Sequence, residues 1–174
     1  MVMNAIDIVA ELMAAAAATA PKTRGLDYVE TKIVRGDELE QLAKAVEEFP
    51  RTPRTAYFSH NAQNIRECRA LLLVGLKSSP PNGLDCGACG FPDCKAMAKH
   101  GKVDGNFQGP VCMFRLLDMG IALGSAVKTA SIHNIDNRIM YSAGVAARRM
   151  GLVDWDVAMG VPLATGAKNI FFDR

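Results

Sequence analysis

The chain has 174 residues, of which 49% are apolar, and it carries a formal net charge of +2. This length suits one globular domain, and the even spread of acidic and basic residues excludes the clustered basic face of a nucleic-acid-binding protein. No apolar run approaches the ~20 residues of a membrane span, and no basic leader opens the chain. We therefore expect a cytoplasmic protein that binds neither a membrane nor nucleic acid.

The first part of the chain predicts two helices with a strand between them. Residues 4–20 predict a helix, because apolar side chains recur on one face every three or four residues. Residues 28–34 predict a strand. Asp37 and Glu40 then have the spacing of a capping box, which predicts a helix that ends before Pro50.

A continuous apolar run follows at residues 71–76, after a short polar helix predicted over residues 59–68. Such a run, bounded by turn residues, predicts a strand that is buried on both faces, as in α/β sheets. Cys68 lies just before it and has no other cysteine at ligand spacing. We interpret this thiol as a small buried hydrophobic group.

The next segment, residues 80–112, is rich in glycine, proline and cysteine, and it predicts a module inserted between the buried strand and the following helix. Its cysteines have the spacing C-x2-C-x4-C-x17-C and are Cys86, Cys89, Cys94 and Cys112. Four thiolates complete the coordination of a [4Fe–4S] cluster. Gly87 and Gly90 would let the backbone wrap closely around such a compact group.

Two helix starts are also predicted at this site. Asp93 is placed to cap a short helix that begins at Cys94, and Cys112 follows Pro110 at the start of a longer helix. The positive ends of two helices would favour an anionic cluster.

Two other interpretations of the cysteines stay open. Zinc also takes four thiolates, although its usual sites combine two short cysteine pairs. A disulfide or free thiols would leave the glycines and the spacing without a role. Five cysteines, four of them assigned to one site, favour a reducing compartment over a disulfide framework.

The longer helix is predicted over residues 111–129. Its apolar face is predicted to comprise Phe114, Leu117, Ile121 and Val127. Gly120 and Gly124 lie one turn apart, which favours close packing of another element against this helix.

The last third of the chain predicts one more helix and one more strand. Residues 136–150 predict the helix, with Gly151 at its C-terminal end. Residues 153–161 alternate between apolar and small or acidic side chains, which predicts a strand closed by Pro162. Residues 170–172 are apolar and are expected to pack on the domain or across a dimer partner.

The run from Asp85 to Cys112 resembles the four-cysteine [4Fe–4S] module of electron-transport and corrinoid iron–sulfur proteins, which shares Gly87, Gly90 and Phe91. The resemblance implies that the four cysteines are the cluster ligands. In place of the module's usual Pro-Gly-Gly, this chain continues with Met113. The chain also resembles an uncharacterised family of ferredoxin-domain proteins, mostly of anaerobes, through the sequences TAPK at 19–22 and KNIFFDR at 168–174.

A weaker resemblance is to the flavin-dependent nitroreductase fold, and it rests on the alanine-rich first helix ending in Ala-Pro, the long central helices and the final strand running into Gly-Val-Pro. It implies an α/β fold, with a mixed sheet flanked by helices, in a homodimer that shares its flavin sites. It also implies an FMN cofactor, whose phosphate would be bound by cationic side chains. The candidates are Lys22, Arg24, Lys168 and Arg174. The Arg-Arg-Ser motif that begins the first helix in that family has no counterpart here.

We therefore predict a single α/β domain over residues 1–174 that carries a [4Fe–4S] cluster and transfers electrons to or from a protein or small molecule. A flavin oxidoreductase fed by the cluster is the first alternative. A non-enzymatic metal protein, with a structural or redox-sensing role, is the second. No catalytic residue is assigned.

Overall fold

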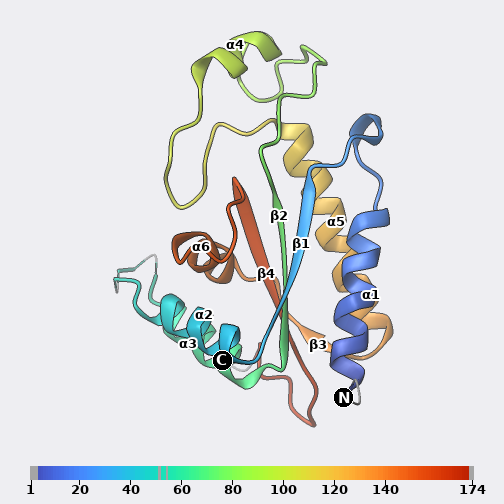
Figure 1. Ribbon diagram of the computed structural model, residues 1–174, viewed down its shortest axis with the longest axis vertical. Coiled ribbons are helices and arrows are strands. Elements are labelled where there is room, and N and C mark those ends of the chain that lie inside the picture. Colours follow the sequence, from blue (N-terminus) through green and yellow to red (C-terminus); the bar gives the residue numbers. More distant parts are fainter. Residues whose placement is uncertain (1–3, 51, 54, 173–174) are drawn as a thin grey trace.

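A four-stranded sheet forms the centre of the molecule, and helices cover both of its faces (Figure 1). The computed structural model describes residues 4–50, 52–53 and 55–172. The strands lie in the order β1-β2-β4-β3. Their bounds are Val29–Arg35 for β1, Ala70–Leu76 for β2, Asp136–Asn137 for β3 and Val157–Ala164 for β4. The predicted α/β class is thus confirmed.

The three strand pairings are all antiparallel, which differs from the mixed sheet expected. The seven residues of β2 are all buried, as predicted. This burial does not require parallel neighbours, because helices cover both faces of the sheet. Val29 pairs with Leu76 at one end of β2, and Ala70 pairs with Leu163 at the other.

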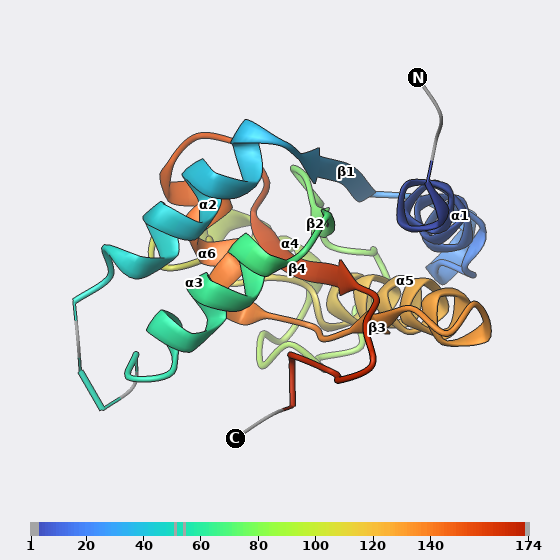
Figure 2. The ribbon, with the colours of Figure 1, turned by 90° about the horizontal axis from the view of Figure 1, so that it is seen from below.

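Two helical layers enclose the sheet, as the view along the strands shows (Figure 2). One layer contains α1 (Ala5–Thr19) and the long α5 (Met113–Ile132). The other contains α2 (Asp37–Glu47), α3 (Phe58–Glu67) and α6 (Tyr141–Arg149). Each layer has its own core: Leu72 and Val74 of β2 face α1 and α5, whereas Leu71 and Leu73 face the other three helices. This alternation is the period of two expected of a strand.

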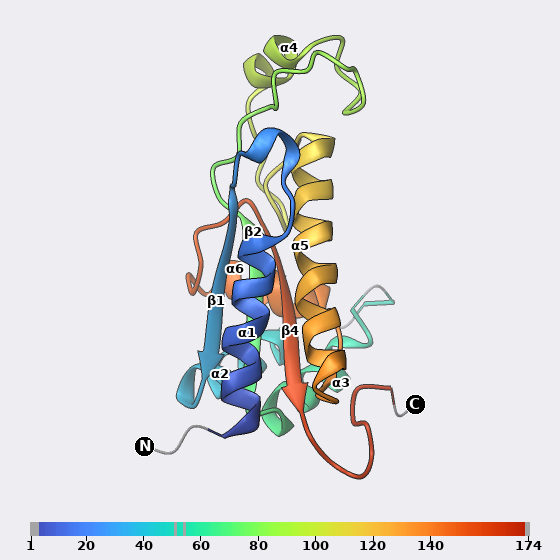
Figure 3. The same cartoon turned by 90° about the vertical axis from the view of Figure 1, so that its right-hand side faces the viewer.

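The segment between β2 and α5 projects beyond the end of the sheet (Figures 1 and 3). It includes the short α4 (Cys94–His100). A second short element, the 3-10 turn Thr23–Gly25, joins α1 to β1 at the same end of the molecule. This end therefore gathers the loops of several elements, and the predicted ligands lie there.

The first predicted helices are confirmed, but the capping box is wrong. Asp37 is the first residue of α2, and Gly36 with φ 55° precedes it without a side-chain cap. Three acidic residues in the first turn face the positive end of the helix dipole instead. The acidic residues therefore predicted the start of the helix correctly, but they do not cap it through their side chains.

The predicted strand over residues 153–161 begins too early and ends too soon. Val153 and Trp155 are buried from a loop, and a Cβ on Gly75 would lie 2.3 Å from the Trp155 ring. The alternating apolar residues at 153–156 are therefore buried by a loop and not by a strand. Pro162 lies inside β4. Its nitrogen points to the same side of the strand as the nitrogen of Gly160, which bonds to Met140. On that side β3 pairs only with Leu163 and Ala164, so no partner strand lies opposite the proline nitrogen.

Two further expectations for the later helices are wrong. Residues 136–137 form β3, so the helix predicted to begin there starts at Tyr141. On α5, Leu117 and Ile121 are 52% and 47% exposed rather than buried. The buried face is instead formed by Arg115, Asp118, Met119, Ala122, Leu123, Ala126 and Ala130. The expectation that the apolar tail packs on the domain is confirmed for Phe171, which is fully buried.

No helix in the described parts of the chain is long and apolar enough to cross a membrane.

Candidate iron–sulfur site

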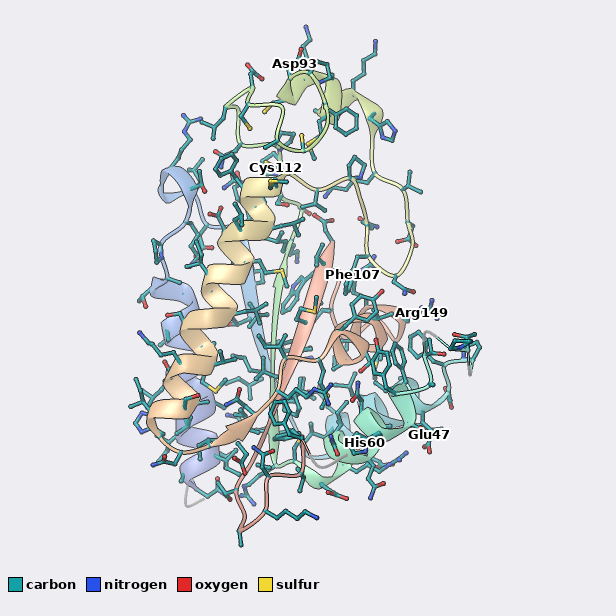
Figure 4. The ribbon with its side chains drawn as sticks, turned by 180° about the vertical axis from the view of Figure 1, so that it is seen from behind. Glu47, His60, Asp93, Phe107, Cys112 and Arg149 are labelled. Atoms are coloured by element: carbon teal, nitrogen blue, oxygen red, sulfur yellow. The ribbon has the colours of Figure 1, made fainter. Side chains whose placement is uncertain are left out.

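The four predicted ligands come from three separate pieces of backbone and line one cavity. Cys86 and Cys89 lie in the loop that leaves β2, Cys94 is the first residue of α4, and Cys112 immediately precedes α5 (Figure 4). The other lining residues include Asn82, Leu84 and Phe114. All five cysteines of the chain are free thiols.

The two glycines between the cysteines have the conformations for which glycine was expected. Gly87 has φ 69° and Gly90 has φ 87°, in the left-handed region that other residues rarely adopt. The amide of Gly90 donates to the carbonyl of Gly87 at 2.9 Å, which closes a tight turn. This turn carries Cys89 back toward the remaining thiols.

Two carboxylates fix the start of α4, where Cys94 lies. The Asp93 carboxylate accepts a hydrogen bond from the Ala96 amide at 2.7 Å, which confirms the predicted cap. The Asp85 carboxylate accepts from the Cys94 amide at 2.8 Å. Cys112 occupies the N-cap position of α5, and its side chain makes no capping bond. Its thiol is therefore left for the cavity, beside the positive end of a 20-residue helix.

Exposure changes across the cavity. Cys86 is exposed, Cys89 and Cys94 are half-buried, and Cys112 is only 5% exposed. The side of the cavity next to the sheet is thus closed, and the side at the tip of the molecule opens to solvent. A group held by the four thiols would be reachable from outside through the side that carries Cys86.

Beneath the cavity lies a buried ion pair that the sequence analysis did not identify. The side chains of Arg115 and Asp118 are 2% and 3% exposed, and Arg115 Nη1 lies 3.4 Å from Asp118 Oδ2. Asp118 Oδ1 also accepts from the amide and the hydroxyl of Thr23, each at 2.7 Å. Arg115 further donates to the carbonyls of Leu26 and Pro80. The signal in the sequence was an opposite charge pair three residues apart in a stretch, residues 113–124, that is otherwise apolar or glycine.

Of the four cationic residues considered for a flavin phosphate, the three that the structure describes do not gather at one place. Lys22 Nζ donates to the carbonyls of Ala17 and Ala18 at 2.6 and 2.7 Å, so it closes the C-terminal end of α1. It also lies 3.4 Å from the Asp27 carboxylate. Arg24 Nη1 donates to the carbonyl of Asn82 at 3.0 Å, beside the cysteine cavity.

Lys168 belongs to the opposite end of the sheet. It follows the end of β4, where the neighbouring Asn169 donates to Asp136, whereas Arg24 precedes the other end of the sheet. Arg174 lies outside the described residues. A phosphate site that uses these cations stays a prediction.

The four cysteines line one small cavity. In the described parts of the chain, no three His, Cys, Asp or Glu side chains converge closely enough to hold one metal ion. The donor set fits a [4Fe–4S] cluster, because four cysteines line one cavity and thiolates are the ligands of that cluster.

Comparison with known families agrees with this geometry. A family model for an Fe–S cluster matches residues 82–100, which contain three of the four thiols. The family described as uncharacterised proteins containing a ferredoxin domain matches residues 108–174. A protein of Archaeoglobus fulgidus, itself described as uncharacterised, is 44% identical over 169 residues, which are 97% of this chain and 91% of that protein. The chain belongs to this ferredoxin-domain family, as the resemblance implied.

Solved structures with a similar fold are nitroreductases and a flavin reductase. The NADPH:FMN oxidoreductase of Vibrio harveyi superposes with a TM-score of 0.57 at 15% identity, over 97% of this chain and 64% of that enzyme. The FMN-dependent nitroreductase NfnB of Mycobacterium smegmatis gives 0.57 at 14% identity, over 92% of this chain and 78% of that enzyme. Nitroreductase A of Vibrio parahaemolyticus gives 0.57 at 16% identity, over 97% of this chain and 61% of that protein. The chain thus spans less than two thirds of the length of both Vibrio proteins, and the likeness confirms the predicted nitroreductase-like fold.

Proposed function

We propose that the protein is an electron-transfer protein whose redox centre is a [4Fe–4S] cluster bound by Cys86, Cys89, Cys94 and Cys112. The observation that carries this proposal is that four free thiols from three pieces of backbone line one cavity. Four thiolates are the ligand set of this cluster. The positive end of α5 and the amides around the Gly87 turn favour the anionic group.

The exposed side of the site supports electron exchange with another molecule. Cys86 is exposed, and the apolar side chains of Leu84 and Met113 beside the cavity are 43% and 45% exposed. A cluster at this position would lie near the surface at the end of the molecule, where a protein or small-molecule partner can approach. The lack of a disulfide among the five cysteines also suits a reducing compartment such as the cytoplasm.

Reversible reduction separates electron transfer from a structural or sensing role. The full chain, purified without oxygen and loaded with iron and sulfide, is titrated electrochemically while its absorption and electron paramagnetic resonance are recorded. We expect one electron to be taken up and released per cluster without loss of iron. Irreversible loss of iron on reduction would contradict the electron-transfer proposal and favour a structural or sensing role.

A flavin-dependent oxidoreductase fed by the cluster is the second candidate, because the fold is that of FMN-dependent enzymes. Lys22 and Arg24 already have partners within the chain, so their role in binding FMN would require them to exchange these bonds. Titration of the cluster-loaded chain with FMN tests this candidate by flavin fluorescence. Saturable quenching with one FMN per chain would favour the oxidoreductase, and unchanged fluorescence would leave the cluster as the one redox group.

We further propose that two copies associate through the exposed face of α5. The exposed residues in the first three turns of this helix are all apolar or glycine: Met113, Leu116, Leu117, Gly120, Ile121 and Gly124. The first exposed charge on the helix is Lys128. A Cβ on Gly120 or Gly124 would meet nothing within 4 Å, so the two glycines form a notch beside the ridge of Leu117 and Ile121.

This ridge and notch complement each other across a two-fold axis, which is the symmetry of most homodimers. Leu117→Glu should convert the dimer to a monomer, because the new charge would be buried against a copy of itself. Like charges opposed in an interface cost several kcal/mol, which corresponds to at least a ~100-fold weaker dimer. Sedimentation equilibrium measures the change.

Ile139→Glu is the matched control, because Ile139 is 44% exposed but lies outside α5. It should leave the association constant unchanged. A wild-type chain that sediments as a monomer, or a Leu117→Glu variant that stays dimeric, would contradict the proposed interface.

A further inference from the structure

Asn82 is a buried residue whose polar side chain has no partner within the chain. It is 4% exposed, and neither Oδ1 nor Nδ2 has a hydrogen-bond partner. A buried amide left in this state costs about 1–3 kcal/mol. Three described residues carry such orphaned side-chain atoms: Asn61, Ser79 and Asn82. Of these three residues, only Asn82 has both side-chain polar atoms without a hydrogen-bond partner, and only Asn82 lines the four-cysteine cavity.

The backbone on both sides of Asn82 is held in place by arginines. Arg24 Nη1 donates to the carbonyl of Asn82 at 3.0 Å, and Arg115 Nε donates to the carbonyl of Pro80 at 3.3 Å. Arg115 is itself fixed by Asp118 and by stacking over the Tyr28 ring, 4.4 Å from the ring centroid. The next residue, Gly83, has φ 74° and turns the chain toward the cysteines. The backbone that carries Asn82 is thus fixed beside the cavity, which Asn82 lines.

We propose that the Asn82 side-chain amide donates a hydrogen bond from Nδ2 to a sulfur of the bound cluster and so raises its reduction potential. This inference rests on the proposed cluster. Sulfide and thiolate sulfur atoms accept hydrogen bonds, and of the two orphaned atoms only Nδ2 can donate. Reduction adds negative charge to the cluster, so a donor stabilises the reduced form more than the oxidised form.

The same geometry gives Arg24 a role as a positioning residue. Its guanidinium contacts the backbone of Asn82, and its own φ of 60° is uncommon for a residue other than glycine. Arg24 therefore acts on the cluster through Asn82 rather than by direct contact. This differs from the phosphate-binding role considered from the sequence.

The test measures the midpoint potential of the cluster-loaded full chain by spectroelectrochemistry. Asn82→Leu keeps the approximate shape of the side chain and removes the donor. At the wild-type midpoint potential, the ratio of reduced to oxidised cluster should fall about tenfold, which is about 59 mV for one electron. Asn82→Asp should lower the ratio further, because it places a carboxylate beside an anionic cluster. Asn64→Leu, a buried asparagine of α3 (2% exposed), should leave the ratio unchanged.

A second measurement does not depend on any variant. Wild-type chain containing asparagine labelled with ¹⁵N in the side chain is reduced, and pulsed electron paramagnetic resonance should detect coupling of the cluster spin to one labelled nitrogen. No coupling in the wild type, or an Asn82→Leu variant with an unchanged potential, would overturn the hydrogen bond. If Asn82→Leu cannot hold a cluster, the wild-type coupling decides. A wild-type chain that takes up no iron would instead contradict the proposed function.

A double-mutant cycle tests the positioning role of Arg24. Arg24→Lys keeps the positive charge but replaces the guanidinium that bonds the Asn82 carbonyl. It should lower the ratio less than Asn82→Leu does, and it should cause no further change in the Asn82→Leu background. Equal shifts in both backgrounds would show that Arg24 acts independently of Asn82.

Discussion

Cys112 is the most deeply buried of the four predicted ligands, and it is the most distant from the others in sequence. It lies at the start of α5, while the other three thiols belong to the loop and helix that project from the sheet. The cavity is therefore lined by three cysteines of the projecting segment and by Cys112, which lies where this segment joins the main fold. Cys68, the fifth thiol, has a different environment: burial raises its pKa to about 12, and its sulfur donates to the carbonyl of Ile65.

Cys112→Ser should abolish or degrade the cluster, because serine oxygen is a poorer ligand for iron than thiolate sulfur. Iron and acid-labile sulfide per chain should fall to less than about half of the wild-type content. Cys68→Ala is the matched control, since it removes a buried thiol that lies outside the cavity. Full cluster absorption in Cys112→Ser would contradict the ligand assignment.

The ligand spacing, the turn glycines and the Asp93 cap were predictable because each is a short-range pattern within about 30 residues. Asn82, Arg24 and Arg115 were not predictable as a unit. They come from three separate segments, and their contacts arise only when the Thr23–Gly25 turn, the exit of β2 and α5 meet. A buried asparagine also has no signature in a single sequence.

At the level of elements, α6 and β4 approach so closely that one position tolerates no side chain. A Cβ on Gly144 would lie 1.8 Å from the Ala158 carbonyl oxygen and 2.3 Å from its carbon. Both are backbone atoms, so the helix itself must move away from the sheet to admit a methyl group. This contact fixes the distance between one helical layer and the strand that ends beside β3.

Gly144→Ala should lower the free energy of unfolding by at least about 2 kcal/mol, because overpacking here displaces backbone rather than a flexible side chain. Urea denaturation followed by circular dichroism measures the change in a dilute, monomeric sample. Gly124→Ala provides the contrast in an exposed helix position, where alanine should be neutral or stabilise by up to ~1 kcal/mol. Equal stability of the Gly144→Ala variant and the wild type would contradict the close approach.

Element positions followed from periodicity, and the errors had identifiable causes. The apolar residues of α5 predicted its buried face incorrectly because this helix buries an ion pair and exposes leucines, which reverses the usual pattern. Alternation at residues 153–156 came from a loop that buries Val153 and Trp155. Pro162 read as a strand end, yet it lies in β4 because its nitrogen faces an edge without a partner strand at that residue.

At the scale of the whole molecule, the packed core and the cysteine-containing segment lie at different places along its length (Figures 1 and 3). The sheet and its two helical layers form a core of nitroreductase type, while the cysteines lie in the segment that projects from one end (Figures 1 and 3). The exposed face of α5 begins beside Cys112, so the proposed dimer interface and the cluster share an element. If two copies associate through α5, the end of the interface that contains Met113 would lie next to the cluster site at Cys112 of the same chain.

The most direct test of the proposed function is the absorption spectrum of the full chain purified without oxygen, with iron, sulfide, zinc and flavin assayed on the same sample. The proposed function predicts broad brown absorption with about four iron and four sulfide per chain. A colourless protein that contains one zinc and no iron would contradict it, and would mean that the four cysteines hold the fold together rather than carry electrons.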